Sequence, residues 1–187
     1  MQNLIKHLSD ALNKELSIDI ISKEITIQEL QNKEKNSSCK KVTLKTTSKS
    51  LIAFSLDTKI SGQSRIFPFF NNSLGSINKA NDGIIFYKKD NNIFVLLIEL
   101  KSNNLGSYKH QLQAGKNFIL YLNNMLNLTF SKKYNIKDEN IKCLVFSTRK
   151  TERKFQKTRK NIIFEDIDGL NIVELQCNEI HYIEKFL

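Results

Sequence analysis

The stretch that decides the fold is residues 81–101, NDGIIFYKKDNNIFVLLIELK. It contains two apolar runs, residues 83–87 and 93–100, rich in the β-branched and aromatic residues that favour strands. The polar residues between the runs predict a turn. Because so short a connection joins antiparallel strands, we predict a β-hairpin.

The position of the turn fixes the register of this hairpin. If the turn centres on Asp90 and Asn91, Asp82 lies opposite Glu99. Directly opposed residues have Cβ atoms about 4.5–5.5 Å apart on one face of the sheet. Lys101 follows Glu99 by two residues and therefore points to the same face. A shift of one residue would separate the three side chains, so the cluster depends on this register.

Two carboxylates at this spacing suggest a metal site. They repel each other by roughly 3 kcal/mol at an effective dielectric constant of about 20. Mg²⁺ prefers carboxylate oxygens and water, and it would remove the repulsion and activate water beside a phosphate. Lys101 would position or deprotonate that water, or stabilise the charge of the transition state. The alternative is a solvated strand end, but the apolar run that leads into Glu99 favours a functional site.

Three motifs occur in a fixed order around this cluster. Asn81-Asp82-Gly83 opens one strand, Ile98-Glu99-Leu100-Lys101 ends the next, and a predicted helix carrying His110-Gln111-Leu112-Gln113 follows. Over residues 40–147 this order resembles the PD-(D/E)XK nuclease superfamily. The resemblance implies an α/β, restriction-endonuclease-like fold with a mixed central β-sheet flanked by helices. Asn81 stands where the superfamily motif usually has proline.

The resemblance also implies a metal site and a catalytic lysine. Asp82, Glu99 and the backbone carbonyl of Leu100 would bind Mg²⁺ or Mn²⁺, and Lys101 would be the catalytic lysine. Many members add a glutamate from the first helix, for which Glu15 is the candidate.

A glutamine of the following helix often faces the site in this superfamily. Gln111 and Gln113 are two residues apart and cannot share a helix face. Either could contact a phosphate or a water molecule, or both could be surface residues. We favour Gln113, because it precedes Lys116 and Asn117 by one helical turn.

The charge distribution points to a polyanionic partner. The chain has 29 Lys and Arg residues against 19 acids, for a net charge of +10. Such an excess favours a polyanion, either nucleic acid or an anionic membrane surface. We expect nucleic acid as the partner, with DNA ahead of RNA. The alternative for a basic run is a solvated surface segment. The predicted phosphate contacts are Lys116 and the basic residues of segment 148–160, namely Arg149, Lys150, Arg153, Lys154, Lys157, Arg159 and Lys160, with Arg65 beside Ser61 and Ser64 as a further candidate.

The three cysteines, Cys39, Cys143 and Cys177, form no CxxC pair and are odd in number. This argues against a disulfide framework or a zinc site, and we expect a reducing cytoplasm. The N-terminus lacks the pattern of a signal peptide, and no apolar stretch approaches the roughly 18 residues of a membrane span. We expect a cytoplasmic protein with no membrane partner.

The length of 187 residues predicts one domain over 1–187, with a nuclease core at about 40–147 and a basic extension over 148–187. Helical periodicity predicts helices over 2–16 and 108–126, while 24–33 fits either a helix or a strand. Further expected elements are strands over 42–45, 51–56, 141–147, 161–164 and 171–175, and a helix at the end.

The expected function is a metal-dependent endonuclease that hydrolyses phosphodiester bonds, in restriction, defence or a mobile element as the resemblance implies. A homodimer would allow both strands of DNA to be cut. The alternative is a catalytically silent nucleic-acid-binding protein on the same fold. A third hypothesis is another α/β protein whose basic face docks on a partner or a membrane, which requires the hairpin register to be wrong.

Overall fold

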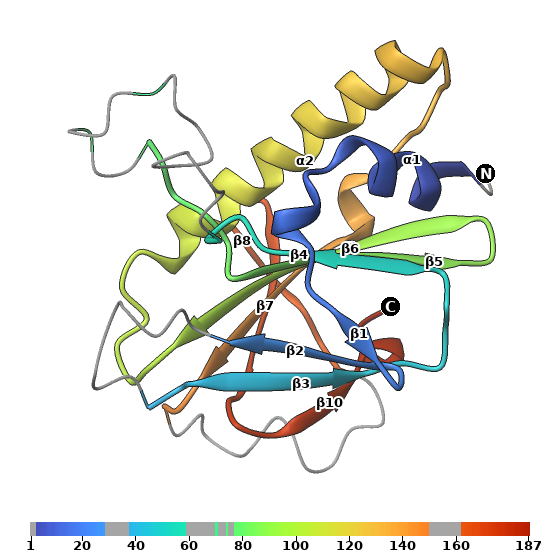
Figure 1. Cartoon of the computed structure of the whole chain (residues 1–187). Coiled ribbons are helices and arrows are strands. Elements are labelled where there is room, and N and C mark those ends of the chain that lie inside the picture. Colours follow the sequence, from blue (N-terminus) through green and yellow to red (C-terminus); the bar gives the residue numbers. More distant parts are fainter. Residues whose placement is uncertain (1–2, 29–37, 59–69, 71–73, 75–76, 150–161) are drawn as a thin grey trace.

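A six-stranded mixed sheet forms the centre of the computed structural model, which describes residues 3–28, 38–58, 70, 74, 77–149 and 162–187 (Figure 1). The strand order is β4-β5-β6-β7-β9-β8. The strands are β4 (Leu51–Phe54), β5 (Gly83–Lys89), β6 (Asn92–Lys101), β7 (Ile141–Ser147), β8 (Glu165–Ile167) and β9 (Leu170–Gln176). The expected strand over 161–164 is not found at 162–164; residue 161 lies outside the described part, and the strand begins at Glu165.

The hairpin β5–β6 has the predicted register. Gly83 pairs with Ile98 and Lys88 pairs with Ile93 in antiparallel strands. Asp90 in the turn has a positive φ of 53°, a conformation that Asp and Asn tolerate better than most residues. Extended by one residue beyond β5, this register sets Asp82 opposite Glu99. The register contradicts the hypothesis that required it to be wrong.

Helix α2 (Tyr108–Phe130) connects β6 to the parallel strand β7. Parallel neighbours need such a crossover, since a short turn cannot return the chain to the same end of the sheet. Its buried residues recur at helical spacing: Leu112, Gly115, Ile119, Leu122 and Leu126. Helix α1 (Asn3–Ala11) is shorter than predicted and is followed by a 3-10 turn over Lys14–Leu16.

A second sheet was not predicted. It has the order β1-β2-β3-β10, formed by β1 (Ile20–Ile21), β2 (Glu24–Gln28), β3 (Lys41–Lys45) and β10 (Ile180–Tyr182). The alternative of a strand within 24–33 is the correct one, because Ile25 and Ile27 alternate inward along β2. At the end of the chain the expected helix is only the 3-10 turn Ile183–Phe186, which follows β10.

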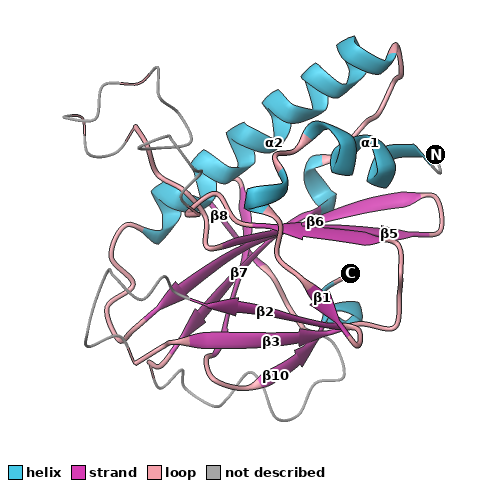
Figure 2. Ribbon diagram, in the orientation of Figure 1, coloured by secondary structure: helices cyan, strands magenta, loops and turns pink. Residues whose placement is uncertain are grey.

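The elements form three layers, shown in Figure 2. One apolar core lies between α1, α2 and the six-stranded sheet, with Leu8, Phe86 and Ile119 among its members. The other contains Ile27, Leu44 and Ile98 and lies between the two sheets. Both described α-helices therefore cover one face of the central sheet, whereas the small sheet covers the face where helices were expected. The class α/β is correct.

Cys39 and Cys177 form a disulfide, so the prediction against one was wrong. The two cysteines are 138 residues apart, and their Cα atoms are 5.6 Å apart. They meet because Asn178 after β9 hydrogen-bonds to Lys41 at the start of β3. Cys143 is the free thiol, and burial in the core raises its pKa to about 12.

None of the helices in the described part of the chain combines the length and apolar character needed to cross a membrane.

Candidate active site

Glu99 and Lys101 form an ion pair at the end of β6. Lys101 Nζ lies 2.9 Å from Glu99 Oε2, and the Glu99 side chain has no exposed surface. Asn81 Nδ2 donates a hydrogen bond of 2.8 Å to Glu99 Oε1. One carboxylate oxygen therefore faces an ammonium group, and the other faces an amide.

Asp82 is tied to the same strand end. The backbone N–H of Leu100 donates to Asp82 Oδ2 over 2.6 Å. A carboxylate that accepts a short backbone hydrogen bond is held in a fixed orientation. The hairpin register and this bond together bring the two predicted acids into one site.

The environment of Glu99 opposes its negative charge. Burial raises the pKa of the Glu99 carboxyl well above its ordinary value, and the charge of Asp82 raises it further. The Lys101 ion pair and the Asn81 hydrogen bond lower this pKa but do not cancel the rise. Two acids placed so close in a poorly solvated position are costly for the fold, and such sites are candidates for function.

Lys101 is held by α2 as well as by Glu99. Its Nζ donates to Gln111 Oε1 over 2.7 Å, and Gln111 Nε2 donates to the Ala80 carbonyl over 3.4 Å. Gln113, the preferred residue of the two, is exposed and hydrogen-bonds to Asn117 instead. The pattern of buried residues in α2 distinguishes the two glutamines. Gln111 precedes the buried Gly115 by one helical turn and therefore lies beside the buried face of the helix.

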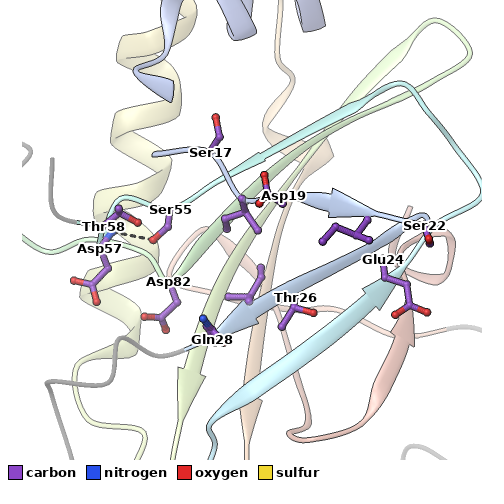
Figure 3. A pocket seen from close by; sticks show the side chains of 13 residues that line it. Ser17, Asp19, Ser22, Glu24, Thr26, Gln28, Ser55, Asp57, Thr58 and Asp82 are labelled. Carbon is purple, nitrogen blue, oxygen red and sulfur yellow. Dashed lines mark hydrogen bonds between the residues drawn. The ribbon is translucent and has the colours of Figure 1, made fainter. Parts of the chain in front are cut away.

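Glu15 is exposed in the 3-10 turn Lys14–Leu16 and does not line the cleft in which Asp82 lies. This cleft has a volume of about 620 Å³ and runs between β2 and the end of β4. In Figure 3 the side chains of Asp57 and Asp82 turn toward the same end of it. Asp57 lines this cleft together with Asp82 and was not singled out from the sequence. It follows β4 by three residues, as expected for a group at a strand end.

Of the predicted phosphate contacts, Arg149 and Lys116 lie within the described residues, and both have protein partners. Arg149 donates to both carboxylate oxygens of Glu174 in β9. Lys116 ion-pairs with Asp138 over 2.8 Å and also donates to the Gly169 carbonyl. Outside the described residues lie Lys150, Arg153, Lys154, Lys157, Arg159, Lys160, Arg65, Ser61 and Ser64.

The donors present are hard oxygens, which fits Mg²⁺ or Mn²⁺ in chemical kind: the carboxylates of Asp82 and Glu99 and the carbonyl of Leu100. A cation would also relieve the repulsion that raises the pKa of Glu99. In the described part of the chain, no three His, Cys, Asp or Glu side chains converge as a metal-binding group. Both oxygens of Glu99 are in contact with Asn81 and Lys101.

Comparison of the chain with protein-family models, curated proteins and solved structures gives no match.

Proposed function

We propose that this protein is a metal-dependent endonuclease that hydrolyses phosphodiester bonds, with DNA preferred over RNA as its substrate. The observation that carries the proposal is the buried Glu99–Lys101 ion pair at the end of β6, beside Asp82. A purely structural role does not require this ion pair, because replacing a buried ion pair with well-packed apolar residues often leaves the stability of a protein unchanged or raises it.

The order of elements around the cluster supports the same function. Three antiparallel strands, β4 to β6, are followed by α2 and the parallel strand β7. Asn81-Asp82-Gly83 and Glu99-Leu100-Lys101 lie at the strand ends required by the resemblance to PD-(D/E)XK nucleases. The restriction-endonuclease-like fold is part of this proposal.

The proposed metal ligands are Asp82, Glu99 and the Leu100 carbonyl, where Mg²⁺ or Mn²⁺ supplies Lewis-acid activation of water and neutralises charge at the phosphate. Lys101 has three N–H donors, of which one binds Gln111 Oε1, while the ammonium group also forms the ion pair with Glu99. A remaining donor would face the phosphate and stabilise negative charge as the water oxygen attacks phosphorus. The P–O bond to the leaving sugar breaks, the water loses a proton and the leaving oxygen gains one.

The proposal is tested by incubating the full chain with plasmid DNA, single-stranded DNA and RNA in Mg²⁺, Mn²⁺ or EDTA. We expect cleavage of DNA that requires the metal and is lost in Glu99→Gln. The matched control is Glu179→Gln, because Glu179 is exposed near β10, away from the cluster. Cleavage that persists in EDTA, or in Glu99→Gln, would overturn the mechanism.

A catalytically silent nucleic-acid-binding protein is the second candidate, favoured by one observation. Glu99 has no exposed surface, and both of its oxygens already contact protein groups. This candidate predicts DNA binding that weakens steeply with salt, without cleavage under any metal condition.

The biological setting proposed is restriction, defence or a mobile element. The cytoplasm expected from the cysteines loses that support, because Cys39 and Cys177 form a disulfide. Cutting both strands of DNA calls for two sites, and a homodimer would provide them. Sedimentation of the protein alone and with a DNA duplex tests the homodimer directly.

A further inference from the structure

Asn81 is the residue before Asp82, and its side chain is completely buried between the central sheet and α2. We propose that Asn81 is a positioning residue for Glu99, and that Gly115 of α2 is a glycine because it leaves room for Asn81. The kinetic part of this inference rests on the proposed nuclease function, whereas the contact itself does not.

The backbone of Asn81 is anchored to the two residues that follow Phe54 at the end of β4. Its carbonyl accepts hydrogen bonds from Leu56 N over 3.2 Å and from Ser55 Oγ over 3.5 Å. From this anchored position Nδ2 reaches Glu99 Oε1 at 2.8 Å. The amide thus links the chain beyond β4 to the end of β6.

The contact gives Glu99 two fixed partners on its two oxygens. Asn81 holds Oε1, while Lys101 holds Oε2 at 2.9 Å. Without Asn81 the carboxylate could rotate about its last bond and move Oε2 relative to Lys101, which Gln111 holds from α2. The orientation of both site residues therefore depends on an amide that would not itself touch a substrate.

Gly115 lies directly against this amide. A Cβ at position 115 would fall 2.8 Å from Asn81 Cγ and would overlap Oδ1. Because both the amide and the helix are buried here, neither has free space to move. Glycine inside a helix is less favourable than alanine, so its presence in the middle of α2 requires a local reason. The space occupied by Asn81 supplies one.

The oxygen of the same amide is a second sign of function. Asn81 Oδ1 is buried without a hydrogen-bond partner among the described residues. An unsatisfied buried carbonyl is costly, and an apolar side chain of the same size would avoid that cost. Asn81 donates to Glu99 through its amide nitrogen. The amide oxygen is part of the same group and is buried with it, without a partner among the described residues.

A double-mutant cycle tests the inference, using Gly115→Ala, Asn81→Ala and the double variant, with Asn117→Ala as an exposed control on α2. Melting temperature, kcat and KM are measured in Mg²⁺. We expect Gly115→Ala to lower the melting temperature despite its better helix propensity, and to lower kcat about tenfold or more with little change in KM. In the Asn81→Ala background, Gly115→Ala should raise the melting temperature and leave kcat unchanged.

Additive effects in the two backgrounds, or a higher melting temperature for Gly115→Ala alone, would overturn the inference. If Asn81→Ala fails to fold, Asn81→Ser replaces it, since serine lacks the amide oxygen that a Cβ at position 115 would overlap. If the wild type does not cleave, the proposed function fails, yet the contact is still decided. The effect of Asn81→Ala on the melting temperature must then differ between the wild-type and the Glu99→Gln backgrounds. Equal effects in the two backgrounds would refute the positioning role.

Discussion

Glu99 carries its charge in the least solvated part of the site, and this has a consequence for stability. Its pKa in the folded protein is raised by burial and by Asp82, relative to an ordinary value of 4.5. The folded state therefore holds a proton on Glu99 more tightly than the unfolded chain does. Its contribution to stability is present below that ordinary value and is lost as the pH rises through the raised pKa.

We expect Glu99→Gln to be more stable than the wild type at about pH 8, by about 1 kcal/mol or roughly 2–4 °C in melting temperature. Lys101 keeps Gln111 as a partner and is partly exposed, so it is not left as an unpaired buried charge. The difference should shrink as the pH falls below the ordinary value of 4.5 to about 4, because Glu99 in the unfolded chain then also becomes mostly protonated. Thermal unfolding in EDTA at both pH values measures it. A less stable variant at the higher pH would contradict this account.

Glu184 shows the opposite behaviour. Burial alone would raise its pKa, but hydrogen bonds from Thr47 and Thr46 prevail and lower the pKa to about 2. Oε1 accepts from Thr47 N, Thr47 Oγ1, Thr46 Oγ1 and Tyr87 Oη, at 2.7–3.1 Å. These bonds join the end of the chain to the β3–β4 loop and to β5.

We expect Glu184→Gln to lower stability at neutral pH by about 1 kcal/mol, since the group is partly exposed. The stability that the carboxylate provides is present above about pH 4.5 and is lost as the pH falls toward 2. Urea unfolding at neutral and acidic pH tests this. The wild type and the variant should converge in acid, and a constant difference would contradict the assignment.

At the scale of elements, Gly83 sets the distance between the two sheets. A Cβ at this position would overlap Ile27 Cδ1 and lie 3.3 Å from Ile27 Cγ1 and Cγ2. Gly83 directly follows Asp82, so the close packing of β2 on β5 also supports the site.

We expect Gly83→Ala to cost about 1–3 kcal/mol, because both groups lie in a closely packed core. Ile27→Val removes the nearest atom and should restore part of that loss in the double variant. Chemical unfolding of the two single variants and the double variant measures the coupling. Equal losses from Gly83→Ala in the wild-type and Ile27→Val backgrounds would exclude the contact as the cause.

The elements also show how far the sequence can be interpreted. The β5–β6 hairpin was predictable with its register, because two apolar runs and a polar turn are local signals. The pairing of β10 with β3 was not, since β10 is a short strand without a signal of its own and lies far from β3 in the chain. Asp82, Glu99 and Lys101 follow from local pattern. The role of Asn81 does not, because its contacts with Glu99 and Gly115 depend on how three elements pack.

At the scale of the molecule, the Cys39–Cys177 disulfide joins the start of β3 to the end of β9. The odd number of cysteines argued against a disulfide in the sequence. It is odd because Cys143, which is buried in the core, is unpaired. A crosslink across so long a loop restricts the unfolded chain and typically contributes about 2–4 kcal/mol.

We expect one reactive thiol per chain when the protein is denatured without reductant, and three after reduction. Cys39→Ser should lower the melting temperature of the oxidised protein and make it insensitive to reductant. Three thiols without reductant would show that the disulfide does not form in the isolated protein.

The central claim is that Lys101 acts with Asp82 and Glu99 to cleave nucleic acid. The most direct test is the single-turnover cleavage rate of saturating protein on a DNA duplex in Mg²⁺, for Lys101→Met and Lys109→Met. Lys109 is a matched control, since it lies at the start of α2 but pairs with Asp168 at the surface. We predict a loss of about a hundredfold or more for Lys101→Met, a rate near that of the wild type for Lys109→Met, and no cleavage in EDTA. Equal rates for the two variants, or a wild type that never cleaves, would contradict the account.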